Sequence, residues 1–131
     1  MGLPVKKADH KFTYADYSSW PDDERWELMG GVAYNMSPAP TSSHQKISFE
    51  LSGLIRDSLK GNHCQAFTAP FDVYFPQYPG QDFNSINTIV QPDISVICDP
   101  EKIIKKGCLG APDIIFEILS PSTSKKDLNE K

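Results

Sequence analysis

Two short segments of the sequence place a carboxylate inside an otherwise apolar run. Residues 91–96 contain Asp93, and residues 116–120 contain Glu117. Burying an unpaired carboxylate costs several kcal/mol or forces its protonation, so we expect the two acids to lie together around a positive group. A divalent cation suits this role, because Mg²⁺ binds through one or two carboxylates and completes its shell with water and substrate phosphate.

Each acid taken alone also has an ordinary structural explanation. An aspartate after a proline, such as Asp93, is commonly a turn or strand-end residue. A glutamate in a strand, such as Glu117, is commonly an edge residue or an ion-pair partner. Spacing alone leaves these explanations open, and the hypothesis of a metal site depends on the two acids occurring on successive strands.

The elements that must position these acids follow from the hydrophobic periodicity. The pattern predicts a short helix at 14–20 capped by Thr13 and Asp16, a β-hairpin of 25–29 and 32–36, a long helix at 43–60, and strands at 64–68, 71–75, 89–98 and 113–119. The last of these strands is almost wholly apolar, which is typical of a central strand buried on both faces. Residues 76–88 and 99–112 predict a loop and a charged turn. A final helix is expected to begin near Ser124.

The length of 131 residues suits one domain. We expect a flexible segment at 1–11 and a single domain at 12–131, in which the short final helix indicates that C-terminal strands are missing. The first residues lack the apolar core of a signal peptide and no apolar run is long enough to span a membrane, which predicts a cytoplasmic protein. The three cysteines show no metal-binding spacing, and we expect free thiols at Cys64, Cys98 and Cys108.

The net charge of −4 and the pI of about 5.3 limit the possible functions. A protein that coats nucleic acid without specificity usually carries a broad basic face, which this composition does not favour. A nuclease is still compatible with it, because an acidic metal site can coexist with a local basic strip.

Several segments share motifs with a known family. They are Trp26-Glu27-Leu28 with Gly31, Met36-Ser37-Pro38 with His44, Pro92-Asp93-Ile94-Ser95-Val96, and GAPDIIFEILSPST at 110–123. Through these motifs the chain resembles the Uma2 family, a domain of unknown function placed among the restriction-endonuclease-like proteins of the PD-(D/E)XK nuclease superfamily. The resemblance begins at Tyr14 and implies an α/β (α+β) fold, in which a mixed central sheet is flanked by helices and carries both acids on neighbouring strands.

The resemblance also implies the roles of individual residues. Asp93 matches the aspartate of the family's Pro-Asp motif and Glu117 the acid of its Glu-x-Lys motif, so both are expected to bind the metal. Leu119 stands where that motif has lysine. The lysine is then expected from the following helix, where Lys131 fits best and residues 125–126 are alternatives. Beside a metal-bound water, a lysine would stabilise the developing hydroxide.

Three further polar residues have less certain roles. Glu27 occupies a position where nucleases of this superfamily often carry another catalytic acid, although Gly30 replaces the aspartate usual in the family pattern. An exposed strand residue explains Glu27 equally well. His44 opens the long helix and could orient a phosphate or a water, or be an ordinary surface residue. Asp72 is predicted to point outward from its strand.

The resemblance implies an endonuclease that uses Mg²⁺ or Mn²⁺ to hydrolyse phosphodiester bonds in DNA. A homodimer is one expected form, since dimers are common among enzymes that cut both strands. The absent lysine and the acidic pI favour an alternative, in which the same fold has lost catalysis and serves as a binding module. A second alternative is an inert fragment. The sequence does not distinguish DNA from RNA as the nucleic acid, nor does it give a sequence preference.

Overall fold

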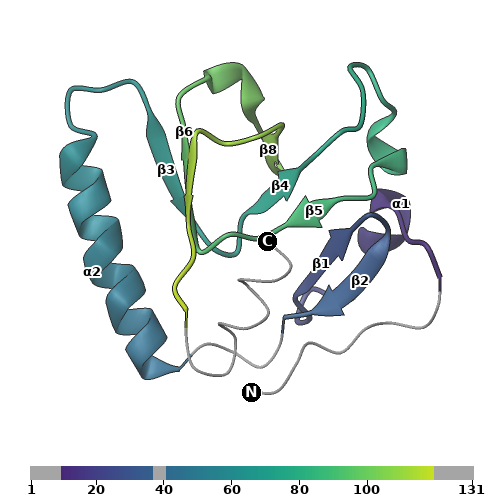
Figure 1. Ribbon diagram of the computed structural model, residues 1–131, viewed down its shortest axis with the longest axis horizontal. Helices are drawn as coiled ribbons and strands as arrows, with labels where there is room; N and C mark the ends of the chain where they lie inside the picture. The colour runs from purple at the N-terminus through teal and green to yellow at the C-terminus, as the bar shows by residue number, and fades with distance from the viewer. Residues whose placement is uncertain (1–9, 37–40, 120–131) are drawn as a thin grey trace.

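The computed structural model describes residues 10–36 and 41–119. The predicted N-terminal segment up to residue 9, the final helix and all three candidate lysines lie outside these ranges. The described chain has mixed α and β structure with two sheets and one long helix (Figure 1), so the predicted fold class is confirmed. No helix within the described ranges has the length and apolar character that a membrane crossing requires.

The larger sheet has six strands in the order β2-β1-β5-β4-β8-β7. Its strands are β1 (Trp26–Met29), β2 (Val32–Asn35), β4 (Asp72–Tyr74), β5 (Ile89–Val90), β7 (Ile103–Ile104) and β8 (Gly107–Leu109). Only β4 and β8 pair in parallel, which makes the sheet mixed as predicted. The β1–β2 hairpin turns at Gly30 and Gly31, which both have positive φ, a conformation that glycine adopts without a steric penalty.

The smaller sheet consists of β3 (Gln65–Thr68), β6 (Ile94–Ile97) and β9 (Ile114–Phe116), all antiparallel, with β6 in the middle. The long helix α2 (Ser42–Ser58) lies alongside this sheet (Figure 1). It buries Ile55 against Ile94 and Val96 of β6. The helix begins at Ser42 and ends at Ser58, close to the predicted 43–60. Its N-terminus is capped by the Thr41 hydroxyl, which accepts a hydrogen bond from the His44 amide at 3.2 Å.

Short elements complete the larger sheet. Helix α1 (Tyr14–Tyr17) is shorter than the predicted 14–20, although the Asp16 carboxylate accepts from the Thr13 amide as expected. The 3₁₀ turns η1 (Phe83–Ser85) and η2 (Pro100–Lys102) lie in the predicted loops. The predicted turn at 99–112 also contains β7 and β8, whose few residues are too short to show periodicity. Their isoleucine, cysteine and leucine side chains join the core of the sheet.

The predicted strand at 89–98 is two strands that belong to different sheets. β5 ends at Val90 and β6 begins at Ile94, and residues 91–93 carry the chain from one sheet to the other. Pro92 contributes to this break, since proline has no N–H to donate to a strand ladder. The prediction of one continuous strand was wrong because both halves are apolar and periodicity does not report a change of sheet.

The predicted central position of the last strand is also wrong for the described chain. β9 pairs only with β6 among the described strands, and it stands at the end of the smaller sheet. Ile114 is 52% exposed and Ile115 is 46% exposed. The fully buried central strand is instead β6, which has the same kind of apolar sequence.

Cys64 and Cys98 form a disulfide. Gln65 pairs with Ile97 in the antiparallel ladder, so the next residues outward, Cys64 and Cys98, face each other at the end of β3 and β6. The prediction of free thiols at these two positions is therefore wrong, since the scattered sequence spacing hid a cross-strand pair. Cys108 is free and buried, as predicted.

We predict that the Cys64–Cys98 bond stabilises the fold by about 3–4 kcal/mol, because it closes a loop across a sequence separation of 34 residues. Urea unfolding of the oxidised and the reduced protein measures this difference. The double variant Cys64→Ser/Cys98→Ser should unfold at one midpoint regardless of reductant. Thiol titration of the denatured, unreduced protein should find Cys108 alone, and reaction at Cys64 or Cys98 would contradict the prediction.

Candidate functional site

The register of the smaller sheet brings the two predicted acids together. Ile94 of β6 pairs with Phe116 of β9, so the next positions along the antiparallel ladder are Asp93 and Glu117. Directly opposed residues in an antiparallel pair point to the same face of the sheet. Asp93 and Glu117 are both partly buried and lie just beyond the ends of their strands. Continuing the register by one position therefore sets Asp93 and Glu117 opposite each other at one end of the sheet.

Asp93 is held from both sides. One carboxylate oxygen, Oδ2, accepts a hydrogen bond from the backbone amide of Ile118 at 2.7 Å. The other, Oδ1, lies 3.2 Å from Nε2 of His44. His44 comes from the first turn of α2, and its side chain is only 18% exposed. Asp93 and His44 are thus in contact, and Asp93 is also tied to the residue that follows Glu117.

The donor set at this place fits a divalent cation of the magnesium type. Two carboxylates supply the hard oxygen ligands that Mg²⁺ prefers, and the remaining ligands of Mg²⁺ are commonly water and substrate phosphate. Within the described ranges, no three His, Cys, Asp or Glu side chains are grouped closely enough to surround one ion. The fit therefore rests on Asp93 and Glu117, with an open coordination shell.

Glu27 lies on β1 of the larger sheet and is fully buried. Its Oε2 accepts a hydrogen bond of 2.7 Å from the backbone amide of Gln91, two residues before Asp93. The interpretation of Glu27 as an exposed strand residue is therefore wrong. The contact that the structure shows for this carboxylate is with the segment that leads into the site.

Asp72 is also placed differently from its prediction. Instead of pointing outward, it is partly buried on β4, where its Oδ1 accepts from the Tyr17 hydroxyl at 2.9 Å and from Gln91 Nε2 at 2.9 Å. Its Oδ2 accepts from the Tyr74 hydroxyl at 3.0 Å. Arg25 Nε donates to Gln91 Oε1 at 3.0 Å. The alternation of residues along β4 predicted an exposed Asp72 and did not reveal this cluster. Asp72 does stand between apolar residues, which is the same signal that identified Asp93.

The pKa values in this cluster follow from burial. Burial raises the pKa of Asp72 above its ordinary value, and this effect outweighs the hydrogen bonds from Tyr17, Tyr74 and Gln91 that lower it. Burial and the negative charge of Asp72 also raise the pKa of Tyr17 and of Tyr74 well above the ordinary range. Both hydroxyls therefore stay protonated at neutral pH and remain donors to the carboxylate.

We predict a pH-dependent contribution of Asp72 to stability. Its pKa is raised above the ordinary 3.8, so the folded state keeps a proton that the unfolded state has lost. The resulting stabilisation is fully present below pH 3.8 and is lost as the pH rises through the folded pKa. Urea unfolding across acidic and neutral pH should show the wild type losing stability relative to Asp72→Asn as pH rises. A difference between the two proteins that does not change with pH would contradict this.

Comparison with known proteins supports the motif assignment. A family model named Uma2, described as "Putative restriction endonuclease", matches residues 14–131. The uncharacterized protein slr1290 of Synechocystis sp. is 29% identical over 123 residues, which cover 92% of this chain. The matched region is 60% of the length of that relative. The family match includes every element that forms the site.

Proposed function

Because the chain belongs to the Uma2 family, we propose that it is a metal-dependent nuclease that hydrolyses phosphodiester bonds in DNA at Asp93 and Glu117. The observation that carries the proposal is the register of β6 and β9, which sets these two acids opposite each other. Paired carboxylates at a strand end, in a family described as restriction endonucleases, suit phosphodiester hydrolysis better than the structural roles that each acid could have alone.

Asp93 and Glu117 would hold the Mg²⁺ or Mn²⁺ ion. When bound, such an ion lowers the pKa of a coordinated water and neutralises charge on the phosphoryl oxygens. The protein fixes the direction of the Asp93 carboxylate through the Ile118 amide, so little reorganisation is needed on substrate binding. The partial burial of both acids limits the water that competes with substrate for the site.

His44 supports the site through Asp93. Its Nε2 lies within contact distance of Asp93 Oδ1, and its backbone amide is fixed by the Thr41 hydroxyl. An imidazole in this position can donate a hydrogen bond from Nε2 to the carboxylate and so fix its orientation. We assign His44 to orienting Asp93 and, through it, the attacking water or the scissile phosphate.

The lysine of the proposed site would come from beyond β9. The position two residues after Glu117 is Leu119, whose side chain is 45% exposed and carries no charge. Lys131 remains the preferred candidate, and its location lies outside the described residues. A cation there would stabilise negative charge that develops on the phosphoryl group.

We predict that Asp93→Asn and Glu117→Gln each slow cleavage of a supercoiled plasmid in Mg²⁺ by about 100- to 1000-fold, as loss of one charge-stabilising group typically does. Both substitutions keep the size of the side chain and remove only its charge. Calorimetric titration with Mn²⁺ should show weaker metal binding in each variant. Asp23→Asn is the matched control, since Asp23 is exposed in the turn that precedes β1. Cleavage by the two site variants at the wild-type rate would refute the assignment.

A separate prediction concerns Glu27, which we assign to positioning the segment that carries Asp93. Glu27→Ala leaves the buried Gln91 amide without its acceptor, and we expect the free energy of unfolding to fall by about 1–3 kcal/mol. Glu27→Gln retains an acceptor oxygen and should keep both stability and cleavage within about tenfold of wild type. If Glu27→Gln folds normally but loses metal binding, Glu27 is a metal ligand instead.

The alternative function is a binding module that has lost catalysis. Leu119 in place of the family's lysine is the observation that favours it. In that case the wild-type protein would bind nucleic acid without cutting it in Mg²⁺ or Mn²⁺, and Asp93→Ala would bind as tightly as wild type. The plasmid assay and a binding assay performed on the same samples distinguish the two functions.

A further inference from the structure

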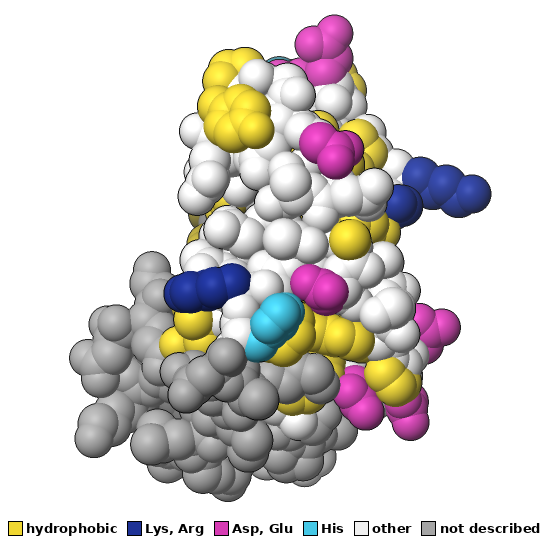
Figure 2. All heavy atoms as spheres, turned by 90° about the vertical axis from the view of Figure 1, so that its right-hand side faces the viewer, with side chains coloured by type: hydrophobic (Ala, Val, Ile, Leu, Met, Phe, Trp, Pro, Cys, Tyr) yellow, Lys and Arg dark blue, Asp and Glu magenta, His cyan; other side chains and the backbone are white. Residues whose placement is uncertain are grey.

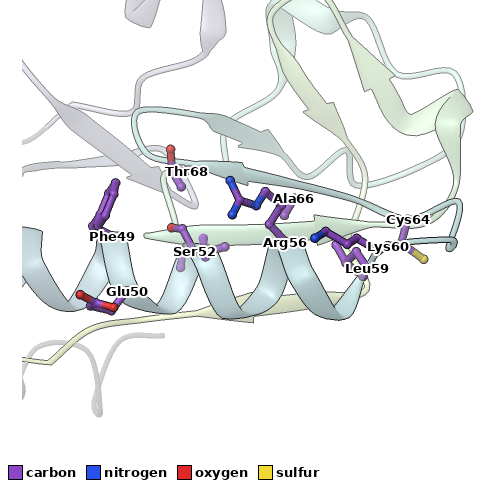
Figure 3. Close-up of a pocket in the computed structure, with 11 residues that line it drawn as sticks. Phe49, Glu50, Ser52, Arg56, Leu59, Lys60, Cys64, Ala66 and Thr68 are labelled. Atoms are coloured by element: carbon purple, nitrogen blue, oxygen red, sulfur yellow. The ribbon is translucent and has the colours of Figure 1, made fainter.

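A groove runs between α2 and β3, next to the proposed site. It has a volume of about 560 Å³ and is bounded by Phe49, Arg56 and Lys60 on the helix and by Ala66 and Thr68 on the strand. Figure 3 shows Arg56 and Lys60 lying between the helix and the strand, with Phe49 standing nearer the other end. This volume is in the usual range of ligand pockets.

The groove begins beside the paired acids. Ile94 and Thr68, which pair in the ladder of β3 and β6, line it. Ile94 directly follows Asp93 in the chain, and the first turn of the same helix carries His44, which contacts Asp93. A chain-like ligand that lies along the groove would therefore extend away from the site where we place the chemistry.

The groove is lined by two cations, Arg56 and Lys60, and by the exposed ring of Phe49. Lys46, Phe49, Gly53 and Arg56 follow a spacing of three and four residues, which aligns them along one side of α2, and Lys60 continues this spacing just beyond the end of the helix at Ser58. This side differs from the face of Leu51 and Ile55 that packs on the sheet. We call these five positions the basic stripe.

The aromatic residue of the basic stripe, Phe49, is unusually exposed. Phe49 is 80% exposed although it belongs to a residue type that is usually buried. Gly53 has no side chain to fill the space next to it, and a Cβ built there meets no atom within 4 Å. The stripe therefore leaves room beside an aromatic ring that has solvent on most of its surface.

The charges of the stripe are available to a ligand. Arg56 and Lys60 both approach Asp57, at 3.6 and 3.5 Å, but their side chains are 77% and 75% exposed. Exposed ion pairs of this kind contribute little and are readily exchanged for a stronger anion. Glu50 also lines the groove, so the favourable charge is concentrated at its Arg56 and Lys60 end.

Figure 2 shows the face formed by the right-hand side of Figure 1, where the visible lysine and arginine side chains of the described residues stand apart from one another. An acidic protein that acts on nucleic acid needs a local concentration of positive charge. The basic stripe supplies such a concentration along the helix whose first turn carries His44, with Arg56 and Lys60 at the end farther from the acids.

We propose that the groove binds a single strand of the substrate nucleic acid, with Arg56 and Lys60 on its phosphates and Phe49 stacked on a base. This inference rests on the proposed function, which it extends by naming the form of the substrate. Cationic side chains along a groove with an aromatic platform are the combination that binds single strands without sequence preference. The helical part of the stripe, from Lys46 to Arg56, extends roughly 15 Å at the rise of a helix, and Lys60 follows just beyond the end of α2. This length accommodates a few nucleotides.

The test measures binding of a fluorescent 12-nucleotide DNA strand by anisotropy at several salt concentrations, in the Asp93→Asn background so that the strand is not cut. Phe49→Ala should raise Kd about tenfold, equivalent to ~1.4 kcal/mol. The double variant Arg56→Gln/Lys60→Gln should lower the slope of log K against log salt by about 1.4, as expected for two lost phosphate contacts. Lys105→Gln/Lys106→Gln is the matched control, because these two lysines lie outside the groove.

Two further ligands identify what the groove recognises. An RNA strand of the same sequence should bind through the same residues, whereas the corresponding DNA duplex should bind more weakly, because its bases are not free to stack on Phe49. Tighter binding of the duplex that is insensitive to Phe49→Ala would overturn the single-strand proposal. An extended acidic peptide that competes for the groove while none of the nucleic acids binds would also overturn it.

The same groove variants, made with Asp93 intact, separate this inference from the proposed nuclease function. If the wild type cleaves DNA and the groove variants raise KM with little change in kcat, both stand. If the wild type cleaves and the groove variants change neither Kd, salt slope nor KM, the groove inference fails and the nuclease function stands. If the strand binds through the groove but no divalent ion supports cleavage, the nuclease function fails and strand binding alone stands.

Discussion

The crossing from one sheet to the other at residues 91–93 is the feature on which the rest of the structure depends. Gln91 is 8% exposed, and both its backbone and its side chain are hydrogen-bonded. The backbone amide of Gln91 donates to the Glu27 carboxylate. The side chain of Gln91 accepts from Arg25 and donates to Asp72. A buried polar group without a partner costs as much as several favourable contacts provide. These bonds therefore fix where β5 ends and where the following Asp93 emerges.

Burying two carboxylates, Glu27 and Asp72, around one crossing is expensive and needs dedicated donors. The hydroxyls of Tyr17 and Tyr74 donate to Asp72, and the backbone amide of Gln91 donates to Glu27. The network defines one geometry, because a shifted register would separate every donor from its acceptor. A site that requires a fixed carboxylate benefits from this hydrogen-bond network. If the segment at 91–93 were held by apolar contacts alone, small displacements of Asp93 would cost little.

Much of the fold could be predicted because its signals are local. The hairpin followed from Gly30 and Gly31, and the long helix followed from its periodicity. The disulfide and the change of sheet at Pro92 could not, because they depend on which strands become neighbours. The exposed position of β9 was missed for the same reason: its isoleucines resemble those of β6, and only pairing distinguishes a central strand from an outer one.

The site residues show the same division between local and non-local information. Residue type and motif identified Asp93 and Glu117, but the role of Asp72 depends on Tyr17, which is 55 residues away in sequence. Alternation along β4 predicted an exposed carboxylate because the pattern records only the neighbours on one strand. The partners that make its burial tolerable come from a helix and from the crossing segment.

For the proposed nuclease, the electrostatic problem is how an acidic chain can approach a polyanion. A net charge of −4 repels nucleic acid at long range, and the two acids of the proposed site would add to that repulsion until the proposed cation is bound. Attraction must then act at short range, where an exposed arginine and lysine a few ångströms from a phosphate outweigh distant like charges that are screened over about 8–10 Å by salt. An aromatic contact adds affinity that salt does not weaken. In such a design binding depends on fit within a groove more than on overall charge, which restricts productive contact to strands that reach the carboxylates.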